Sequence, residues 1–365
     1  MLAIIINSIL LVSKTGGDLA TANNKLLSIE NELEQLKEED PYKVNEELKN
    51  KIKSVETVYL KSVESYEELL KLKESSDISE EFDNLYTKAL TELSKQDYSQ
   101  AESTLNELTQ KINAEKDKIT QTLPAPLPSK ASNVPPGSGF SSQTVSTDVG
   151  SFTVSLIASD LSSTKVIVDT ASEGDCRDGC PVLPLGDYVS RNGAFAGING
   201  SYFCPAEYPS CAGKTNSFDT LLMNKNKVYF NSDNNTYSNV PAVIFGSGWI
   251  RFVSRSLEWG RDTGIDSMIS NQPLLIQGNN ITFGGDEDPK KGSRAGRSFV
   301  GNKGNTVYIG VVHGATVVES AHTLHALGME NALNLDSGGS TALWSGGYRV
   351  GPGRNIPNAI LFVQK

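Results

Sequence analysis

The first third of the chain has a hydrophobic pattern with the period of an α-helix. Apolar residues recur at Leu48, Ile52, Val55, Tyr59, Val63, Tyr66 and Leu70. Because the positions between them are mostly charged or polar, the apolar positions form one narrow stripe along a helix. Such a stripe is typical of a coiled coil or of a long helical hairpin. We therefore predict an all-α arm over residues 18–122.

Two interruptions divide the predicted arm into separate helices. Proline is tolerated only in the first turn of a helix, so Asp40-Pro41 marks a break. Ser75-Ser76-Asp77 marks a second break, after which helical spacing resumes. The arm has no catalytic constellation. We expect it to be a spacer, or an element for self-association or for binding a protein partner.

The composition changes at residue 123. Residues 123–147 are rich in Pro, Ser and Gly, which predicts a linker that is first extended and then flexible. A domain is then expected over residues 148–365. Its clearest strand candidates are residues 152–157 and 165–169, expected to form a hairpin, and residues 306–312 and 359–363.

The same region contains few helical segments. Residues 317–327 have the clearest helical spacing. Strands and helices do not alternate strictly, so we predict an α+β fold with a mixed β-sheet and few helices, preceded by the all-α arm.

Glycine content and charge divide the chain at the same place. No glycine lies between Asp18 and Pro136, and 30 of the 32 lie from Gly137 onward. Residues 18–118 contain 14 Lys against 24 Asp and Glu, a net charge of −10 that equals that of the whole chain. This acidic arm argues against nucleic acid and against anionic membrane surfaces as partners.

The N-terminus suggests export. Residues 2–12 are apolar but too short to span a bilayer. They have the length of the apolar region of a signal peptide, although no basic segment precedes them and no Ala-x-Ala site follows. A buried helix end is the alternative. We expect residues 1–13 to be a signal or anchor remnant, and the protein to be exported or membrane-anchored outside the cytoplasm.

The stretch from Asn334 to Thr341 reads Asn-Leu-Asp-Ser-Gly-Gly-Ser-Thr. The pattern predicts a short strand that delivers Asp336 to a glycine-rich loop. Glycine lets backbone N–H groups approach a ligand closely, and consecutive N–H groups can form a nest for an anion. An acid beside such a nest suits a phosphate or a polarised oxygen. The ordinary alternative is a β-turn of small residues.

Three further motifs in the domain could carry chemistry. Asn199-Gly200 ends a predicted strand before an aromatic pair, although Asn-Gly alone is an ordinary hairpin turn. Arg297 lies just ahead of a strand, where an arginine can clamp a phosphate or form a surface ion pair. Arg354, in the loop before the last strand, could be structural or a second anion contact.

In this order and spacing, the four motifs resemble the phosphodiester glycosidase family, which includes N-acetylglucosamine-1-phosphodiester α-N-acetylglucosaminidases. The resemblance covers residues 148–365. Its most specific part is a Glu-x-Ala helix followed by Asn-Leu-Asp, matched from Glu319 to Ser340. Its supporting parts are an Asn-Gly-small-aromatic-Phe turn at 199–203, a Pro-x-Leu segment at 273–278 and an Arg-Ser-x-apolar-Gly segment at 297–301.

Two positions depart from the family pattern. Ser337 stands where glycine is usual, and His313-Gly314 stands where Asp-Gly is common. The first departure could reshape the anion nest, although serine still has a backbone N–H. The second is consistent with altered specificity or metal dependence.

The resemblance implies hydrolysis of a sugar-1-phosphodiester at the anomeric carbon, in a glycan or glycolipid of the cell envelope or the extracellular space. Asp336 would be a general base or stabilise an oxocarbenium-like centre, and Arg297 would neutralise phosphate charge. Asn199 would orient the sugar or the water, and Glu319 is the second carboxylate candidate. Substrate contacts are expected from Asn334, Ser337, Gly338, Gly339, Ser340, Thr341, Gly200 and Arg354.

The cysteines favour disulfides. Cys176, Cys180, Cys204 and Cys211 are an even number in two clusters, which suits two local disulfides in an exported protein. A Cys204–Cys211 bond would close the loop that follows the Asn199 turn. Zinc is the alternative, but the spacings do not match Cys-x₂-Cys knuckles.

Calcium is the one cofactor that the sequence suggests. Two acidic clusters, Asp262 with Asp266 and Asp286-Glu287-Asp288, could hold it through carboxylate oxygens. Surface turns explain both clusters without a metal. His322 and His325 share a helix but have no evident third ligand, which favours a structural role.

Three functional classes therefore remain. The domain could be a hydrolase, or a glycan-binding module that kept the fold without turnover. The helical arm could instead be the main functional part, as a scaffold in the cell envelope.

Overall fold

The structure is a computed structural model that describes residues 23–35, 40–75, 79–122, 131–233, 235 and 238–365. The described residues form two compact units, one running up to Ser62 with Thr87–Leu105, and one of Val63–Tyr86 with Asn106–Lys365. The apolar residues 2–12 lie outside the described part. Within it, no helix is long and apolar enough to cross a membrane.

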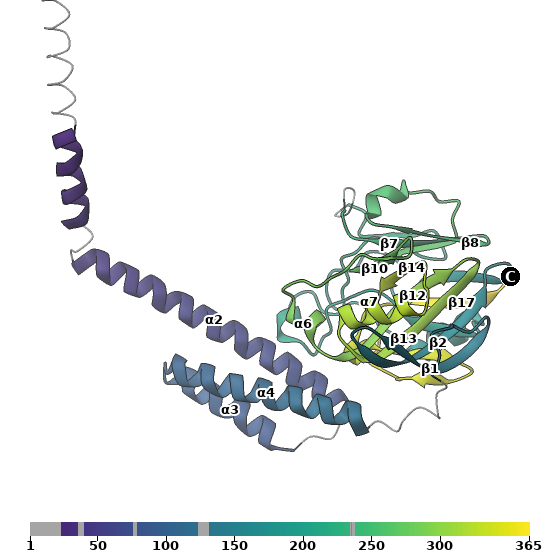
Figure 1. Cartoon of the computed structure of the whole chain (residues 1–365), viewed down its shortest axis with the longest axis horizontal. Helices are drawn as coiled ribbons and strands as arrows, with labels where there is room; N and C mark the ends of the chain where they lie inside the picture. The colour runs from purple at the N-terminus through teal and green to yellow at the C-terminus, as the bar shows by residue number, and fades with distance from the viewer. Residues whose placement is uncertain (1–22, 36–39, 76–78, 123–130, 234, 236–237) are drawn as a thin grey trace, which may run out of the picture. The chain divides into compact units, whose positions relative to one another are not determined.

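The predicted arm is helical in its described part. Residues 23–35 are helical, and α2 (Asp40–Ser75), α3 (Glu81–Ser94) and α4 (Tyr98–Thr122) follow (Figure 1). α2 begins at the first predicted break because Pro41, in its first turn, has no intrahelical hydrogen bond to lose. α2 ends at Ser75, where the second break was predicted. Association of the arm as a coiled coil stays a prediction.

The buried face of α2 differs from the predicted apolar stripe, to which Leu48 and Ile52 belong but Leu69 and Leu72 do not. Leu69 and Leu72 are buried in a cluster with Phe82, Leu108 and Ile112. By contrast, Leu48 and Ile52 are 52% and 56% exposed. Full burial of a Leu or Ile side chain contributes about 1.5–3 kcal/mol. The C-terminal end of α2 therefore has a core of its own, and the preceding part leaves its stripe uncovered.

Residues from 131 onward form a β-rich domain with three sheets. The seven-stranded sheet has the order β1 (Gly139–Thr147), β2 (Gly150–Asp160), β13 (Thr306–Ala315), β12 (Ala295–Lys303), β14 (Asn331–Asn334), β10 (Leu274–Gln277), β11 (Asn280–Ile281). The second sheet has the order β16 (Tyr348–Val350), β15 (Leu343–Ser345), β4 (Ala196–Asn199), β17 (Asn358–Gln364), β3 (Thr164–Thr170).

The third sheet has the order β6 (Tyr229–Phe230), β5 (Leu222–Met223), β9 (Ser267–Ser270), β7 (Ala242–Gly246), β8 (Trp249–Val253). The helices of this region are α5 (Leu185–Asn192), α6 (Pro289–Gly292) and α7 (Val317–Ala326), with 3-10 turns η1 (Pro209–Cys211), η2 (Ser256–Trp259) and η3 (Gly338–Ser340). The α+β prediction is confirmed, and the named strand pairs of the described residues are antiparallel.

Side chains pack on both faces of the seven-stranded sheet. Along β13, Ile309 and Val311 belong to the core shared with the other sheets, whereas Tyr308 and Val312 pack in the layer that contains α7. This alternation follows because successive side chains of a strand point to opposite faces. α7 covers the outer face of the sheet (Figure 1). α5 covers the second sheet in the same way. The core thus fixes the strand ends, from which the site loops emerge.

The predicted linker over 123–147 is wrong for its last nine residues. β1 occupies Gly139–Thr147 and pairs along its whole length with β2. The strand is polar because it lies at the edge of the sheet, where only Gln143 and Val145 are buried. Its composition therefore resembles that of a loop.

The predicted hairpin of residues 152–157 with 165–169 is also wrong. β2 pairs with β1 and β13, whereas β3 pairs with β17 in the second sheet. Leu161 lies in the turn between β2 and β3 and is buried in the shared core. The chain therefore crosses from one sheet to the other at this point instead of reversing within one sheet.

Candidate functional site

Four asparagines are fully buried where strands of the three sheets end. Asn199 ends β4, Asn271 follows β9, Asn334 ends β14 and Asn358 begins β17, and each is 0% exposed. A buried amide is costly unless it is hydrogen-bonded. Their partners are therefore the best guide to what this part of the fold holds in place.

Two of these residues, Asn271 and Asn358, fix the turn that follows β4. The N–H of Gly200 donates to the Asn358 carbonyl at 3.0 Å, and that of Ser201 donates to Asn358 Oδ1 at 2.9 Å. The N–H of Tyr202 donates to Asn271 Oδ1 at 3.0 Å. A Cβ on Gly200 would lie 1.9 Å from Asn358 Oδ1, so only glycine fits. The turn is held by three consecutive backbone N–H groups.

The same turn holds the Asp336 loop. The Asp336 N–H donates to the Gly200 carbonyl at 2.9 Å, and Asn199 Nδ2 donates to the Asp336 carbonyl at 2.6 Å. Asn199 Oδ1 accepts from Ser298 Oγ at 2.8 Å and from the Ala342 N–H at 3.1 Å. The structure thus brings together the Asn199, Asp336 and Arg297 motifs. It places the Asn199 amide among protein partners that support the loop.

Tyr202 is a site residue that the sequence analysis did not single out. Its Oη lies 2.7 Å from Asn334 Nδ2. Burial, and then the nearby negative charge of Asp336, raise the pKa of the Tyr202 phenol, which therefore stays protonated at neutral pH. Asn334 Oδ1 is buried with no hydrogen-bond partner among the described residues, so it can accept from a water or a ligand.

Arg297 is buried beside this group, and part of its guanidinium is occupied. Nε donates to the Ala315 carbonyl at 3.0 Å, and Nη2 donates to the carbonyls of Lys290, at 2.9 Å, and Ser293. Burial lowers the pKa of Arg297, but an arginine stays charged in proteins. Asp336 and Tyr202 are both near enough to interact electrostatically with the Arg297 guanidinium. Arg297 therefore holds the segment around α6 in place and gives the site a positive charge.

The Glu319 side chain caps the N-terminus of α7. It forms a capping box with Thr316, in which Glu319 Oε2 accepts from the Thr316 N–H at 2.8 Å and the Glu319 N–H donates to Thr316 Oγ1 at 3.1 Å. Its other oxygen accepts from Arg294. These contacts start α7. They account for both carboxylate oxygens of the predicted second carboxylate.

The glycine-rich loop after Asp336 turns through η3. Ser337 donates its N–H to Asp336 Oδ1 at 2.9 Å, so the Ser337 N–H already has an anionic partner. Gly338 has φ +65°, a conformation that favours glycine. The N–H groups of Gly338 and Gly339 open the 3-10 turn, and such first N–H groups have no partner within the turn. Thr341 Oγ1 anchors the far side by donating to the Gly296 carbonyl.

Arg354 approaches the same loop from the last connection. Its N–H donates to the Gly339 carbonyl at 2.8 Å. Its guanidinium lies 5.0 Å from the centre of the Tyr208 ring, and Nη2 lies 3.3 Å from Tyr208 Oη. A Cβ on Gly353 would lie 3.0–3.3 Å from the carbonyls of η3 and Thr341. The Arg354 loop is therefore packed closely on the Asp336 loop.

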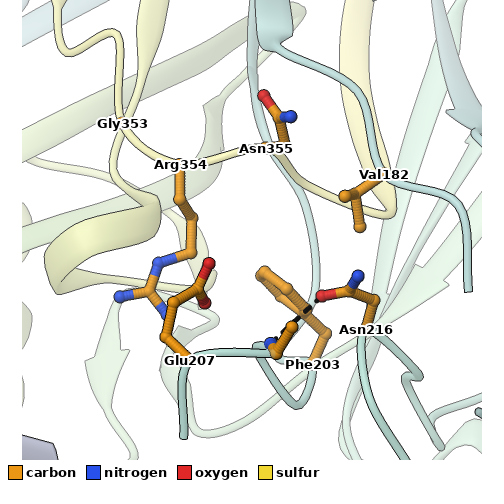
Figure 2. Close-up of a pocket in the computed structure, with 8 residues that line it drawn as sticks. Val182, Phe203, Glu207, Asn216, Gly353, Arg354 and Asn355 are labelled. Atoms are coloured by element: carbon orange, nitrogen blue, oxygen red, sulfur yellow. Dashed lines mark hydrogen bonds between the residues drawn. The ribbon is translucent and has the colours of Figure 1, made fainter. Parts of the chain in front are cut away.

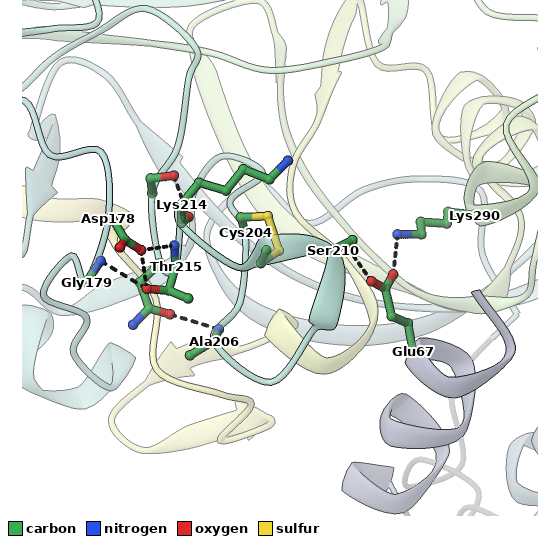
Figure 3. Close-up of a disulfide and its surroundings, with 12 residues drawn as sticks. Glu67, Asp178, Gly179, Cys204, Ala206, Ser210, Lys214, Thr215 and Lys290 are labelled. Atoms are coloured by element: carbon green, nitrogen blue, oxygen red, sulfur yellow. Dashed lines mark hydrogen bonds and ion pairs between the residues drawn. A yellow bond between two sulfur atoms is a disulfide. The ribbon is translucent and has the colours of Figure 1, made fainter. Parts of the chain in front are cut away.

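The predicted disulfides are confirmed. Cys176 is bonded to Cys180 and Cys204 to Cys211. The Cys204–Cys211 loop includes Ser210, whose hydroxyl donates to the carboxylate of Glu67 (Figure 3). Disulfides persist in oxidising environments, which agrees with a location outside the cytoplasm.

Glu67 is a buried carboxylate of α2 that contacts the Cys204–Cys211 loop. It is 2% exposed and forms an ion pair with Lys290 at 3.1 Å. Both residues belong to the same compact unit. The Lys290 carbonyl also accepts from Arg297. Lys290 therefore connects Glu67 to the Arg297 side chain.

The acidic clusters and histidines that could suggest a metal have other partners. Asp262 accepts from the Gly264 N–H, Asp266 pairs with Lys165, and Asp286 pairs with Lys291. Asp288 caps α6.

The histidines also have partners within the protein. His313 Nε2 lies 2.9 Å from Ser155 Oγ, and His322 Nδ1 lies 2.8 Å from Asp148 Oδ1. Among the described residues, no three His, Cys, Asp or Glu side chains are placed to hold a metal.

Comparison with known proteins gives a family match. Residues 192–363 match the family described as phosphodiester glycosidase. No curated protein matches the chain. Among solved structures, a hypothetical protein from Synechocystis is 13% identical, with 62% of each chain covered and a TM-score of 0.45. The chain thus spans 62% of the length of that protein.

Two other solved structures are also similar. One is the zebrafish N-acetylglucosamine-1-phosphodiester α-N-acetylglucosaminidase catalytic domain auto-inhibited by its pro-peptide, with 18% identity, 65% of this chain and 86% of that chain covered, and a TM-score of 0.48. The other is a protein described as exported from Burkholderia pseudomallei, with 13% identity, 58% and 74% coverage, and a TM-score of 0.39. Residues 192–363 of the chain are therefore similar to the phosphodiester glycosidase family.

Proposed function

We propose that this protein hydrolyses sugar-1-phosphodiesters, releasing a free sugar and a phosphomonoester. One observation carries the proposal: the carboxylate of Asp336 lies on a loop held by Asn199 and Gly200, beside the protonated Tyr202 and the positive charge of Arg297. An acid, a neutral hydroxyl donor and a cation at one place suit a reaction in which a phosphate leaves an electron-poor carbon.

Asp336 is the proposed general base or charge stabiliser. As a base, it takes a proton from water while the water oxygen bonds to the anomeric carbon and the bond from that carbon to the phosphate oxygen breaks. The electron pair of that bond leaves with the phosphate. As a stabiliser, its negative charge opposes the positive charge that develops on the sugar ring.

The phosphate needs its charge neutralised more than it needs a proton, because it is already a good leaving group. Arg297 supplies a buried positive charge, and the N–H groups at the start of η3 supply donors. Tyr202, with its raised phenol pKa, contributes as a hydrogen-bond donor and not as a base.

Asn199 is the proposed support of Asp336, since its amide lies between the Asp336 carbonyl, Ser298 and Ala342. Asn334 is the proposed support of Tyr202. Both act on substrate through the residues that they hold. Small displacements of such supports can lower the rate strongly, because catalysis depends on pre-set geometry.

The two disulfides support a substrate outside the cytoplasm. We propose a sugar-1-phosphodiester of a cell-envelope or extracellular glycan or glycolipid, with N-acetylglucosamine-1-phosphodiesters as the first candidates. The zebrafish relative is named for that bond.

The test compares the full-length chain with its Asp336→Asn variant on UDP-N-acetylglucosamine and on simple N-acetylglucosamine-1-phosphodiesters, with released sugar as the readout. We expect the variant to lose at least about a hundredfold in kcat/KM, the range of a general base. Asp262→Asn is the matched control, because Asp262 is exposed and closes a surface turn with Gly264. Equal sugar release by Asp336→Asn and wild type, at equal melting temperature, would contradict the proposal.

A glycan-binding module without turnover is the second candidate. It is favoured by the hydrogen bond that engages the Ser337 N–H with Asp336 and by the carbonyls that occupy Arg297 Nε and Nη2. Saturable binding of the same compounds with no sugar release, from wild type and variant alike, would support this candidate.

A further inference from the structure

A pocket of about 320 Å³ lies beside the Asp336 loop. Its wall includes Phe203, which follows Tyr202 in the chain, and Arg354, whose N–H donates to the Gly339 carbonyl of η3. Figure 2 shows the side chains of Glu207, Arg354 and Phe203 at this pocket. The volume lies at the lower end of the range for small-molecule sites.

The walls of the pocket are cross-linked by bonds that do not involve the catalytic loop. Asn216 Oδ1 accepts from the Ala206 N–H at 3.2 Å, and the Cys204 N–H donates to the Ser217 carbonyl at 2.9 Å. The Cys204–Cys211 disulfide closes the same segment. The walls are therefore set before a ligand enters, which lowers the entropic cost of binding.

A second set of bonds holds the wall that contains Val182. The Cys180 N–H donates to the Thr215 carbonyl at 3.1 Å, and Asp178 Oδ1 accepts from the N–H and the hydroxyl of Thr215 (Figure 3). Hydrogen bonds from Thr215 lower the pKa of Asp178, so the carboxylate that holds this wall is ionised at neutral pH. Bonds from both disulfide loops thus support the walls of one pocket.

The lining combines opposite charges, amides and an apolar surface. Glu207 can accept from two neighbouring hydroxyl groups, and Asn216 and Asn355 can each donate and accept. Phe203 and Val182 offer apolar contacts to C–H groups. A simple anion would meet the negative charge of Glu207, and an apolar ligand would bury polar groups without partners. A ring or chain with several hydroxyl groups satisfies both kinds of surface.

We propose that this pocket binds the polyhydroxylated part of the phosphodiester substrate, with Glu207 as the residue that recognises its hydroxyl groups. The proposal rests on the proposed function for the identity of the substrate. Arg354 lies between the pocket and η3, at the boundary between the hydroxyl-binding part and the phosphate. Such a group could be the sugar that is released or a polyol on the other side of the phosphate.

Calorimetric titration of the full-length chain with N-acetylglucosamine and, separately, with glycerol 3-phosphate tests the pocket without requiring turnover. We expect Glu207→Gln to weaken binding of one of the two compounds by about tenfold or more, as for loss of hydrogen bonds to a charged group. Glu207 is exposed at the pocket rim, so folding should be unaffected. Where hydrolysis occurs, the same variant should raise KM and leave kcat nearly unchanged.

Glu330→Gln is the matched control. Glu330 precedes the start of β14, whereas Asp336 follows its end, so the control lies at the opposite end of the strand. Dependence on Glu207 for N-acetylglucosamine alone assigns the pocket to the sugar, and dependence for glycerol 3-phosphate alone assigns it to the polyol side.

The two proposals can fail separately. Binding that depends on Glu207 without any hydrolysis supports the pocket and contradicts the proposed reaction. Hydrolysis with the same KM in Glu207→Gln and Glu330→Gln, or no binding of either compound to wild type, overturns the pocket.

Discussion

Asn199 illustrates how buried amides hold the segments of this site together. Its side chain is fully buried and bonds to Asp336, Ser298 and Ala342. We therefore assign it to positioning, whereas the sequence pattern suggested contact with sugar or water. A buried amide that bonds to three segments fixes their relative positions, because each lost bond would leave an unpaired polar group.

Gly200 gives a direct test of this arrangement. In Gly200→Ala, the new Cβ would meet Asn358 Oδ1 and its carbonyl, so Asn358 would have to release the Ser201 N–H. We expect a loss of about 2–4 kcal/mol in the free energy of unfolding, from overpacking and from unpaired polar groups. Urea denaturation measures the loss, and kcat/KM should fall with it.

The control for this substitution is Gly174→Ala. A Cβ on Gly174 would meet no atom within 4 Å, and its φ does not require glycine. If both variants unfold at the same urea concentration as wild type, the turn does not depend on the close approach of Gly200 to Asn358.

His313 predicts a pH dependence of stability. Burial lowers the pKa of His313 below its usual 6.5, and Nε2 lies 2.9 Å from Ser155 Oγ. As the pH falls through 6.5, the unfolded chain takes up the proton first, so the folded state loses stability. The slope for one such group is at most about 1.4 kcal/mol per pH unit.

Unfolding by urea between pH 7.5 and 5 should show this loss in wild type and a smaller loss in His313→Gln. Exposed His325 on α7 provides the control, as His325→Gln. An identical pH slope in wild type and His313→Gln would show that the buried imidazole makes no contribution.

Helix α7 and strand β1 show what sequence alone can predict. The helix was predicted at residues 317–327 and is observed at Val317–Ala326, because its apolar spacing and its Thr316 to Glu319 capping box are local signals. β1 was predicted as linker because an edge strand buries few side chains. Its pairing with β2 and the sheet change before β3 are non-local, so no short-range pattern reports them.

The site shows the same division. The Asn199 and Asp336 motifs could be found in the sequence because the residues of each motif are consecutive. In the structure, Asn199 donates a hydrogen bond to the Asp336 carbonyl. Asn271 and Asn358 were missed because a single asparagine within two residues of a proline is typical of a loop. Only the fold reveals that both are fully buried and hold the turn at residues 200–202.

The helical arm is the part of the chain through which we expect copies of the domain to associate. The described part of the arm leaves Leu48 and Ile52 more than half exposed along one stripe, on a highly charged helix. Burying such side chains between two chains would contribute about 1.5–3 kcal/mol each. We therefore expect the full-length chain to self-associate through this part of α2.

Light scattering coupled to size-exclusion chromatography measures the mass directly. Leu48→Glu with Ile52→Glu should give a monomer whose hydrolysis per domain is unchanged, because neither residue belongs to the β-rich domain. Asn50→Glu with Ser54→Glu adds the same charge at the same spacing on exposed positions off the stripe, and should keep the wild-type mass. A monomeric wild type, or equal dissociation by both pairs, would assign the arm to spacing alone, since a specific apolar interface must distinguish the stripe from its neighbours.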